Sequence, residues 1–250
     1  MHPLKISAIS YLNTVPFVYG IQNYPGFSDY EIEFDVPSSC AEKLIHNKTD
    51  VGIVPVATIP FIPDAQIITP YCIGALKAVE TVVLASRKPL SDIRIVYLDT
   101  DSRTSVLLLK VLAKHHWKLN FEFLPLGKKQ WAEFENHEAA VLIGDKTFGL
   151  KNHFALITDL ATQWYQFINL PFVFACWVAN KKLPEPVLQQ FSNALSFGLK
   201  HVDEAVKSVD VSRYPGVNIH RYLTKTISYT LDEEKRQGMR LFLEMSKDIR

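Results

Sequence analysis

The sequence predicts an α/β protein of two lobes with a ligand cleft between them. Short apolar runs typical of buried strands alternate with helix-like stretches in two clusters, residues 1–90 and 93–178. The rest of the chain has helical patterning and needs a sheet to pack against. Because the apolar run Phe172–Ala179 can return the chain to the first cluster, we expect a first lobe of residues 1–90 and 180–250 and a second of 91–179. A single doubly wound domain is the alternative.

The first cluster has the rhythm of βαβ units. Ser39 and Glu42 stand at capping-box spacing, which predicts a short helix that opens there and ends near His46. The flanking apolar runs predict parallel strands with helices packed on both faces. We expect these strands at Leu4–Ile9, Val51–Val54 and Ala78–Ala85.

The second cluster begins with a strand at Ile93–Leu98, and the loop DTDS then leads into an apolar helix that ends near His115 and His116. A helical stretch is expected around Trp131. In the tail, an apolar face over Glu185–Val202 predicts one helix, and a second capping box, Thr230 with Glu233, opens another. Further strands are expected at Phe121–Leu124, Ala139–Ile143, Phe154–Ile157 and Phe172–Ala179.

Composition excludes several classes of protein. The formal net charge is +1 and no basic stripe stands out, so we expect no nucleic-acid partner. Apolar runs such as PFVFACWVA reach about half of the 20 residues that span a bilayer, and MHPLKISAIS lacks the features of a secretory signal. Cys40, Cys72 and Cys176 lie far apart without CxxC pairing. We therefore expect a cytoplasmic, metal-free protein with buried thiols, no membrane partner, and a monomeric or homodimeric state.

The loops that follow strands are the places to look for a site, because ligands of open parallel sheets bind beyond the carboxyl ends of the strands. After the first strand comes SYLNT, in which Ser10, Asn13 and Thr14 offer neutral donors and acceptors beside Tyr11 and close to a helix start. These groups can hydrogen-bond a carboxylate or a hydroxyl. The alternative is a plain turn with a helix cap.

A second loop carries hydroxyls and a guanidinium into the first turn of an apolar helix. A helix N-terminus has a partial positive charge and free N–H groups, so an anion is stabilised there. Arg103 can add a bidentate contact. An ordinary cap with a surface arginine, neutralised by Asp99 and Asp101, is the alternative. The expected anion-binding residues are Ser102, Arg103, Thr104 and Ser105.

Two further positions complete the candidate site. Gly144 follows the strand Ala139–Ile143, allows close approach of the backbone, and is followed by Asp145. Glu80 and Thr81 are neighbours on a predicted strand, so their side chains should point to opposite faces. The sequence contains no Walker A loop, GxGxxG, HExxH or GxSxG motif, so it offers no sign of a nucleotide, zinc or serine-hydrolase site.

These loops resemble those of the chorismate dehydratase family of the futalosine route to menaquinone. The similarity runs in order through SYLNTVPFVYG, DTDSRTSVLLLKVL, AAVLIGD, LPFVFACWVA and YLTKTISYTLDEEKRQGMRLF, nearly the whole chain. It implies a two-lobed, periplasmic-binding-protein-like (type II) fold. It also implies conversion of chorismate, a small anionic substrate, to 3-[(1-carboxyvinyl)oxy]benzoate by loss of water, with no cofactor.

The resemblance also implies roles for individual residues. Asn13 and Thr81 would be catalytic, and Thr81 stands where some relatives have serine. The substrate-binding residues would be Ser10, Tyr11, Thr14, Ser102, Arg103, Thr104, Ser105, Gly144 and Asp145. Because an amide is not basic, Asn13 is expected to position a substrate group rather than to remove a proton. Asp145 is expected to be structural and paired with Arg103, so that a substrate carboxylate takes the proton.

Two other functions stay open at this point. The dihydroxynaphthoate synthase of the same route shares the fold, and His153 is the histidine that would serve as its base. A non-catalytic, cytoplasmic solute-binding or sensor protein is also compatible with the fold, because function depends on the site rather than on the fold.

Overall fold

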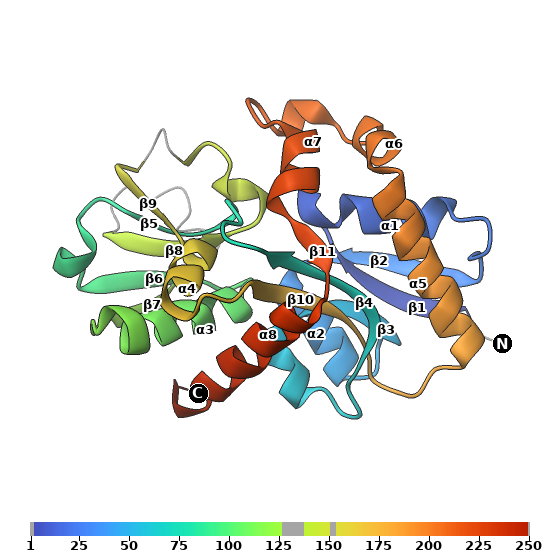
Figure 1. The fold of residues 1–250 in the computed structure, drawn as a ribbon, viewed down its shortest axis with the longest axis horizontal. Coiled ribbons are helices and arrows are strands. Elements are labelled where there is room, and N and C mark those ends of the chain that lie inside the picture. Colours follow the sequence, from blue (N-terminus) through green and yellow to red (C-terminus); the bar gives the residue numbers. More distant parts are fainter. Residues whose placement is uncertain (1–2, 127–137, 151–153, 250) are drawn as a thin grey trace.

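The computed structural model describes residues 3–126, 138–150 and 154–249. In it, two mixed sheets lie in separate lobes, each covered by helices (Figure 1). The α/β class expected from the sequence is confirmed. The helical stretch expected around Trp131 and the histidine at position 153 lie outside the described residues.

The first sheet has the strand order β11-β4-β10-β3-β1-β2. β1 pairs in parallel with β2 and β3, as the βαβ rhythm predicts, whereas β10 runs antiparallel to both β3 and β4. All eight residues of β10 are buried, because both faces of this strand are covered. The bounds of these strands are β1 Leu4–Ile9, β2 Tyr30–Asp35, β3 Val51–Pro55, β4 Gln66–Ala75, β10 Phe172–Ala179 and β11 Ser228–Thr230.

The second sheet has the strand order β7-β6-β8-β5-β9. β6 pairs in parallel with β7 and β8, and β5 pairs antiparallel with β8 and β9. The strands β1, β8 and β10 have the limits predicted from the sequence, while β6, β7 and β9 are shifted toward the C-terminus by one or two residues. The bounds are β5 Val82–Ser86, β6 Ile95–Asp99, β7 Glu122–Leu126, β8 Ala139–Ile143 and β9 Leu156–Asp159.

The sheets divide the chain at other residues than the sequence analysis expects. β5 was expected with the first lobe, within residues 1–90, but it lies in the second sheet; β10 was expected within 91–179 but lies in the first. The chain therefore crosses between the sheets before Val82 and before Phe172, not after residues 90 and 179. An all-buried apolar run shows that a strand is central, but it does not show which sheet receives it.

Helices cover both sheets. α1 packs against α5, α2 against β1 and β3, and α8 against β10. Trp164 packs edge-on against Phe172, and Trp177 against Phe17, so both tryptophans belong to the core. The helices are α1 Val15–Asn23, α2 Pro37–Ile45, α3 Thr104–Val111, α4 Leu160–Ile168, α5 Glu185–Lys200, α6 Val202–Lys207, α7 Ile219–Arg221 and α8 Glu233–Met245.

Both predicted capping boxes are wrong, although a helix lies at each place. α2 begins at Pro37, before Ser39, because the fixed φ of proline suits the first helical position. α8 is capped by Asp232, whose carboxylate accepts the backbone N–H of Lys235, while Thr230 ends β11. A charged cap next to the helix replaces the hydroxyl cap expected two residues earlier.

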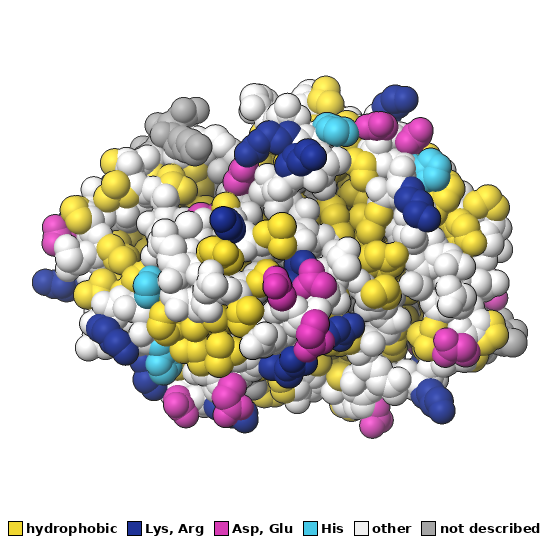
Figure 2. Space-filling model, in the orientation of Figure 1, with side chains coloured by type: hydrophobic (Ala, Val, Ile, Leu, Met, Phe, Trp, Pro, Cys, Tyr) yellow, Lys and Arg dark blue, Asp and Glu magenta, His cyan; other side chains and the backbone are white. Residues whose placement is uncertain are grey.

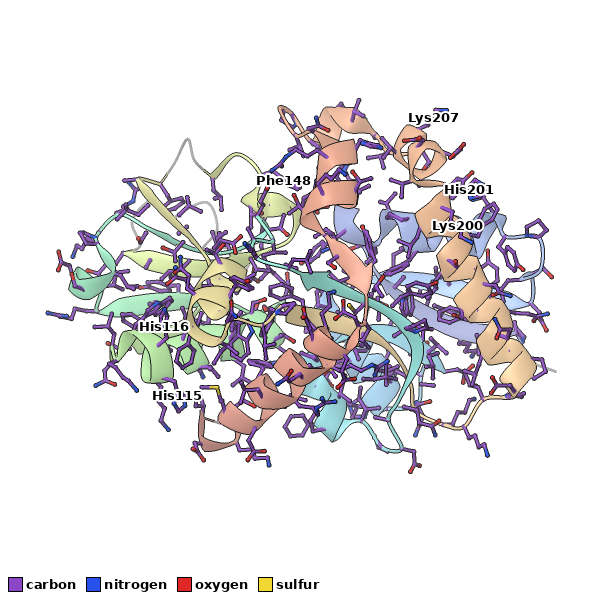
Figure 3. The ribbon with its side chains drawn as sticks, viewed as in Figure 1. His115, His116, Phe148, Lys200, His201 and Lys207 are labelled. Carbon is purple, nitrogen blue, oxygen red and sulfur yellow. The ribbon has the colours of Figure 1, made fainter. Side chains whose placement is uncertain are left out.

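The α3 helix continues as a π-helical turn, Leu112–Trp117, and ends at Lys118 in a left-handed conformation. His115 and His116 lie in this turn, and His116 stacks on Phe167 with ring centroids 5.0 Å apart (Figure 3). Their place at the end of the helix agrees with the sequence analysis. This packing connects the π-helical turn after α3 with the helix that carries Phe167, residues Leu160–Ile168.

The three cysteines are buried and unpaired, as expected. Burial raises the pKa of the Cys40 and Cys72 thiols to about 12. Both thiols therefore stay protonated at neutral pH, which supports a structural role. On the surface, acidic and basic side chains alternate over the face shown in Figure 2.

Glu138 connects two segments of the second lobe through its carboxylate, and we expect it to make the free energy of unfolding depend on pH in the acid range. Its carboxylate pairs with the Lys88 ammonium and accepts the backbone N–H groups of Arg94 at 2.7 Å and Ile95 at 3.0 Å, which lowers its pKa to about 2. A lowered folded-state pKa stabilises the fold above the unfolded pKa. The free energy of unfolding should therefore fall as the pH drops from about 4.5 to about 2.

Urea denaturation across this pH range checks the prediction. Glu138→Gln should reduce the fall in the free energy of unfolding at low pH. Glu122→Gln, a change at an exposed position of strand β7, should leave that fall as it is in the wild type. Parallel curves for the wild type and Glu138→Gln would contradict it.

Candidate functional site

A cleft opens between the two sheets at the carboxyl ends of β1, β3, β6 and β8, as the sequence analysis predicts for this class of sheet. Its unoccupied volume, counted with the solvent at its mouth, is about 510 Å³. The lining residues are Ile9, Tyr11, Asn13, Pro37, Pro55, Ile73, Val79, Thr81, Val82, Ser102, Arg103, Thr104, Ser105, Ile143, Gly144, Phe174 and Ala175.

Of the loop after β1, Tyr11 and Asn13 line the cleft. The loop forms a 3-10 turn at Leu12–Thr14 that runs directly into α1. The side-chain Oδ1 of Asn13 is buried and has no hydrogen-bond partner. Since a buried acceptor without a partner costs free energy, this oxygen is suited to a donor on a bound ligand.

Ser10 and Thr14, which were also expected to contact the substrate, do not line the cleft. The Thr14 hydroxyl donates to the backbone carbonyl of Ile9 at 2.5 Å and lies 2.7 Å from that of Tyr11, so it closes the turn. The Ser10 hydroxyl donates to the carbonyl of Asp35 at 3.3 Å. Both residues line a neighbouring surface hollow instead. The hydrogen bonds of these two residues are those of a local turn, which is the alternative given for them.

The start of α3 forms the wall of the cleft opposite this loop. The hydroxyl of Ser102 accepts the backbone N–H of Ser105 at 3.3 Å, which caps the helix. The Thr104 hydroxyl donates to the carbonyl of Phe174 at 3.1 Å and accepts the backbone N–H of Ala57 at 3.2 Å, so it joins the two lobes. These hydroxyls therefore hold the wall in place as well as lining it.

Arg103 lies at the rim of this wall with 54% of its side chain exposed. Its guanidinium is 3.9 Å from the carboxylate of Glu42, which is also half exposed. The alternative in which Asp99 neutralises Arg103 does not hold, because the buried Asp99 carboxylate pairs with Lys146 at 2.5 Å. A weak, exposed ion pair leaves Arg103 able to turn toward an anion.

Asp145 is turned away from Arg103, so the predicted ion pair between them is wrong. Its two oxygens accept the backbone N–H of Leu12 at 3.0 and 3.1 Å, and one also accepts the Tyr214 hydroxyl at 3.0 Å. Burial raises the pKa of Asp145, while these hydrogen bonds oppose the rise. The Asp145 carboxylate, which belongs to the second lobe, therefore binds a backbone N–H and a side-chain hydroxyl of the first lobe.

Gly144 brings the lobes together at the same place. Its φ of +71° favours glycine, and a Cβ atom here would lie 2.6 Å from the Tyr11 ring. Burial raises the pKa of Tyr11, as do the charges of Asp99 and Asp101, so its hydroxyl stays neutral. The ring closes one side of the cleft without adding charge to it.

Thr81 lines the cleft just before β5, and its hydroxyl lies 2.8 Å from that of Tyr222. Glu80 points elsewhere and forms a bidentate pair with Arg221, at 2.8 and 3.2 Å. The prediction that the two side chains face opposite sides is confirmed, although Glu80 precedes the strand in a left-handed conformation. Sequence reasoning missed the apolar wall, Ile73, Val79 and Phe174, and it missed Tyr222 behind Thr81.

The cleft combines apolar walls with few polar groups. Among its described lining residues there is no carboxylate and no histidine, and Arg103 is the charged residue. A helix start and an arginine suit an anionic group, and the unpaired Asn13 oxygen suits a hydroxyl. The arrangement can bind and orient a small anionic molecule, but it offers no evident base of its own.

Within the described ranges, no cluster of His, Cys, Asp and Glu suited to a metal ion is found, and no helix is long and apolar enough to span a membrane.

Comparisons with known proteins agree with this architecture. Residues 4–248 match the family described as "Menaquinone biosynthesis". The chain is 25% identical to the chorismate dehydratase of Thermus thermophilus, over 98% of this chain and 95% of that protein. A protein from Archaeoglobus fulgidus has a similar structure (TM-score 0.79, 16% identity, 99% and 98% of the two chains covered). So does a Candida albicans protein with the generic periplasmic binding protein fold (TM-score 0.63, 17% identity, 97% and 90% covered).

Proposed function

This chain belongs to the menaquinone biosynthesis family, and from that premise we propose that it acts as a chorismate dehydratase, a hydro-lyase of the futalosine route. The substrate is chorismate, and the products are 3-[(1-carboxyvinyl)oxy]benzoate and water. The relative from Thermus thermophilus carries that name. The observation that carries the proposal is the buried, unpaired Oδ1 of Asn13 in a cleft lined by the start of α3. The proposal includes the cytoplasmic location expected from the sequence.

The reaction removes a hydroxyl and a hydrogen from adjacent ring carbons. The C–H bond beside the enolpyruvyl ether breaks, its electrons form a ring double bond, and the neighbouring C–O bond releases the hydroxyl. The leaving hydroxyl takes up a proton and departs as water, so no net oxidation occurs. The ring becomes aromatic, which supplies the driving force. The protein must therefore orient the substrate and exclude its competing reactions.

One carboxylate of chorismate fits the anion-binding wall, and the other is left to act on the ring hydrogen. The N-terminus of α3 presents a partial positive charge at Ser102–Ser105. Arg103, held weakly by Glu42, adds a full charge at the rim. Apolar residues such as Phe174 and Val79 face the ring and keep water out. These contacts are the same in the ground state and the transition state, so they set affinity rather than turnover.

Asn13 and Thr81 act on the ring hydroxyl. The free Oδ1 of Asn13 accepts the hydroxyl's hydrogen bond and so fixes the direction in which the C–O bond points. The Thr81 hydroxyl, on the neighbouring part of the lining, supports the departing oxygen. The Thr81 contact strengthens as negative charge develops on that oxygen, so it favours the transition state, whereas the Asn13 contact orients the hydroxyl before it leaves.

The substrate itself supplies the base. The lining residues offer no carboxylate or imidazole, the Tyr11 hydroxyl stays neutral, and the Asp145 carboxylate is occupied by Leu12 and Tyr214. A carboxylate of chorismate, bent toward the ring hydrogen, then takes the proton. If Asn13→Ala and Thr81→Ala each kept wild-type turnover while Asp145→Asn abolished it without unfolding, this assignment would be wrong.

One assay tests the proposed function. The purified full chain is added to chorismate, the loss of the diene absorbance is followed, and the product is identified by mass spectrometry. We expect a product lighter than chorismate by one water. Tight binding without turnover would instead indicate a solute-binding or sensor protein. Neither binding nor turnover would favour the dihydroxynaphthoate synthase of the same route, with cyclic futalosine derivatives as the next substrates to assay.

A further inference from the structure

Tyr222 lies behind the cleft, fully buried, and contacts both residues assigned to the ring hydroxyl. Its hydroxyl is 2.8 Å from the Thr81 hydroxyl and is also hydrogen-bonded to the Asn13 side chain. It does not line the cleft. Any effect of Tyr222 on a bound molecule must therefore pass through Asn13 and Thr81.

The backbone around Tyr222 has an uncommon conformation. After the short helix α7, residues Tyr222–Thr226 form a π-helical turn, a feature that is rare and often found at functional sites. Arg221 pairs with Glu80, and Tyr222 pairs with Thr81. These two contacts fix the segment just before β5, where the chain passes from the first sheet to the second. The Thr226 hydroxyl, at the end of the turn, also donates to Glu80, at 3.2 Å. The turn thus fixes the position of Thr81 along the cleft.

The Asn13 contact has one possible direction. Because the Oδ1 of Asn13 has no partner, the contact with Tyr222 is made by the amide N–H of Asn13, which donates to the Tyr222 oxygen. Either hydroxyl can donate in the 2.8 Å contact between Tyr222 and Thr81, and the arrangement that serves the reaction is the one in which the O–H of Tyr222 donates to the Thr81 oxygen. Asn13 is left with Oδ1 unpaired, as observed. Thr81 keeps its own proton, whose nearest partner in the protein is the carbonyl of Val79, 3.4 Å away.

The surroundings of Tyr222 keep its ring and hydroxyl fixed. Phe148 packs edge-on against it, with centroids 5.3 Å apart, and lies between the second lobe and α7 in Figure 3. Burial keeps the Tyr222 hydroxyl protonated, so it does not itself act as a base. A rigid, neutral hydroxyl with one donor and one acceptor role can orient two neighbours at once.

We infer that Tyr222 is a positioning residue that turns the Asn13 oxygen and the Thr81 proton toward the substrate's ring hydroxyl. The inference rests on the proposed function, because it concerns the same reaction. Tyr222 would thereby control turnover rather than affinity, since the anion-binding wall at α3 lies on other elements.

Tyr222→Phe removes the hydroxyl and keeps the ring. We expect kcat for chorismate to fall about 10- to 100-fold, because Asn13 and Thr81 lose their fixed orientation, while KM stays within about twofold. Thr49→Val is the matched control. It removes a buried hydroxyl that donates to the carbonyl of Lys5 at 2.8 Å, ahead of β3 and far from the cleft. It should lower the melting temperature by a similar amount and leave kcat unchanged.

A double-mutant cycle separates positioning from general loss of structure. In a Thr81→Val background, Tyr222→Phe should reduce kcat by a smaller factor than in the wild type, because part of its effect passes through Thr81. Equal factors in the two backgrounds, or a Tyr222→Phe variant with wild-type kcat, would overturn the inference while the proposed function stands. A wild-type protein that leaves chorismate unchanged would overturn both.

Discussion

Replacing Asn13 with alanine is expected to lower kcat for chorismate about 100- to 1,000-fold, with little change in KM. The amide supplies the free acceptor in the cleft and also donates to Tyr222, so its removal takes the acceptor from the ring hydroxyl and one of two hydrogen-bond partners from Tyr222. Binding of the substrate carboxylate depends on the α3 wall, which stays in place. Steady-state kinetics at several chorismate concentrations separate the two parameters.

Asn23→Ala is the matched control for this experiment. Asn23 ends α1, the helix that follows Asn13, and its amide donates to the carbonyl of Tyr19 at the surface. Its loss should leave both kinetic parameters as in the wild type. An Asn13→Ala variant in which KM rises strongly at unchanged kcat would show that Asn13 contributes to binding alone, against the role proposed for it.

Replacing Gly198 with alanine is expected to destabilise the fold by about 2 kcal/mol or more. A Cβ atom at this position would lie 1.8 Å from the backbone oxygen of Pro16, so α1 and α5 would have to move apart. The same contact involves Gly20, where a Cβ atom would lie 2.0 Å from the oxygen of Ala194. The higher helix propensity of alanine returns about 1 kcal/mol, which does not offset the clash. Since α1 follows Asn13 directly, kcat should fall as well.

Urea denaturation measures the loss of stability. Gln190→Ala, at an exposed position on the same helix, should change the free energy of unfolding by no more than about 0.5 kcal/mol. If Gly198→Ala were as stable as the wild type, α1 and α5 would not be in the close contact described here.

Much of the fold could be predicted from residue patterns. β8 and β10 are continuous apolar runs with sharp ends, and β1 is an apolar segment that contains Lys5 and Ser7; the limits of all three follow from the sequence. β4 was missed because Thr69, Pro70 and Tyr71 interrupt its apolar pattern. The sheet to which β5 and β10 belong depends on tertiary pairing, and a fully buried strand carries no periodic signal of its neighbours.

The candidate site could be predicted in part for the same reason. The strand-end rule and the loop motifs lead to Asn13 and the start of α3, and the family resemblance leads to Thr81; the structure brings all three to one cleft. The partners of charged groups could not be predicted, because Asp145 meets Leu12 and Tyr214 only in the folded chain. Tyr222 lies in the stretch YLTKT, for which no helix was predicted, and nothing in these residues signals the π-helical turn.

β10 lies between β3 and β4 at the centre of the first sheet, although a ribosome makes it after every strand of the second. During synthesis the second sheet can therefore close while the first consists of two pieces, the three strands β1 to β3 and the single strand β4. At the usual ribosomal rate, the interval between Ala75 and Phe172 lasts about 5–20 s. Throughout it the edges of β3 and β4 are open to pairing with other chains. The unfinished, ribosome-bound chain is thus the form of this protein most exposed to aggregation.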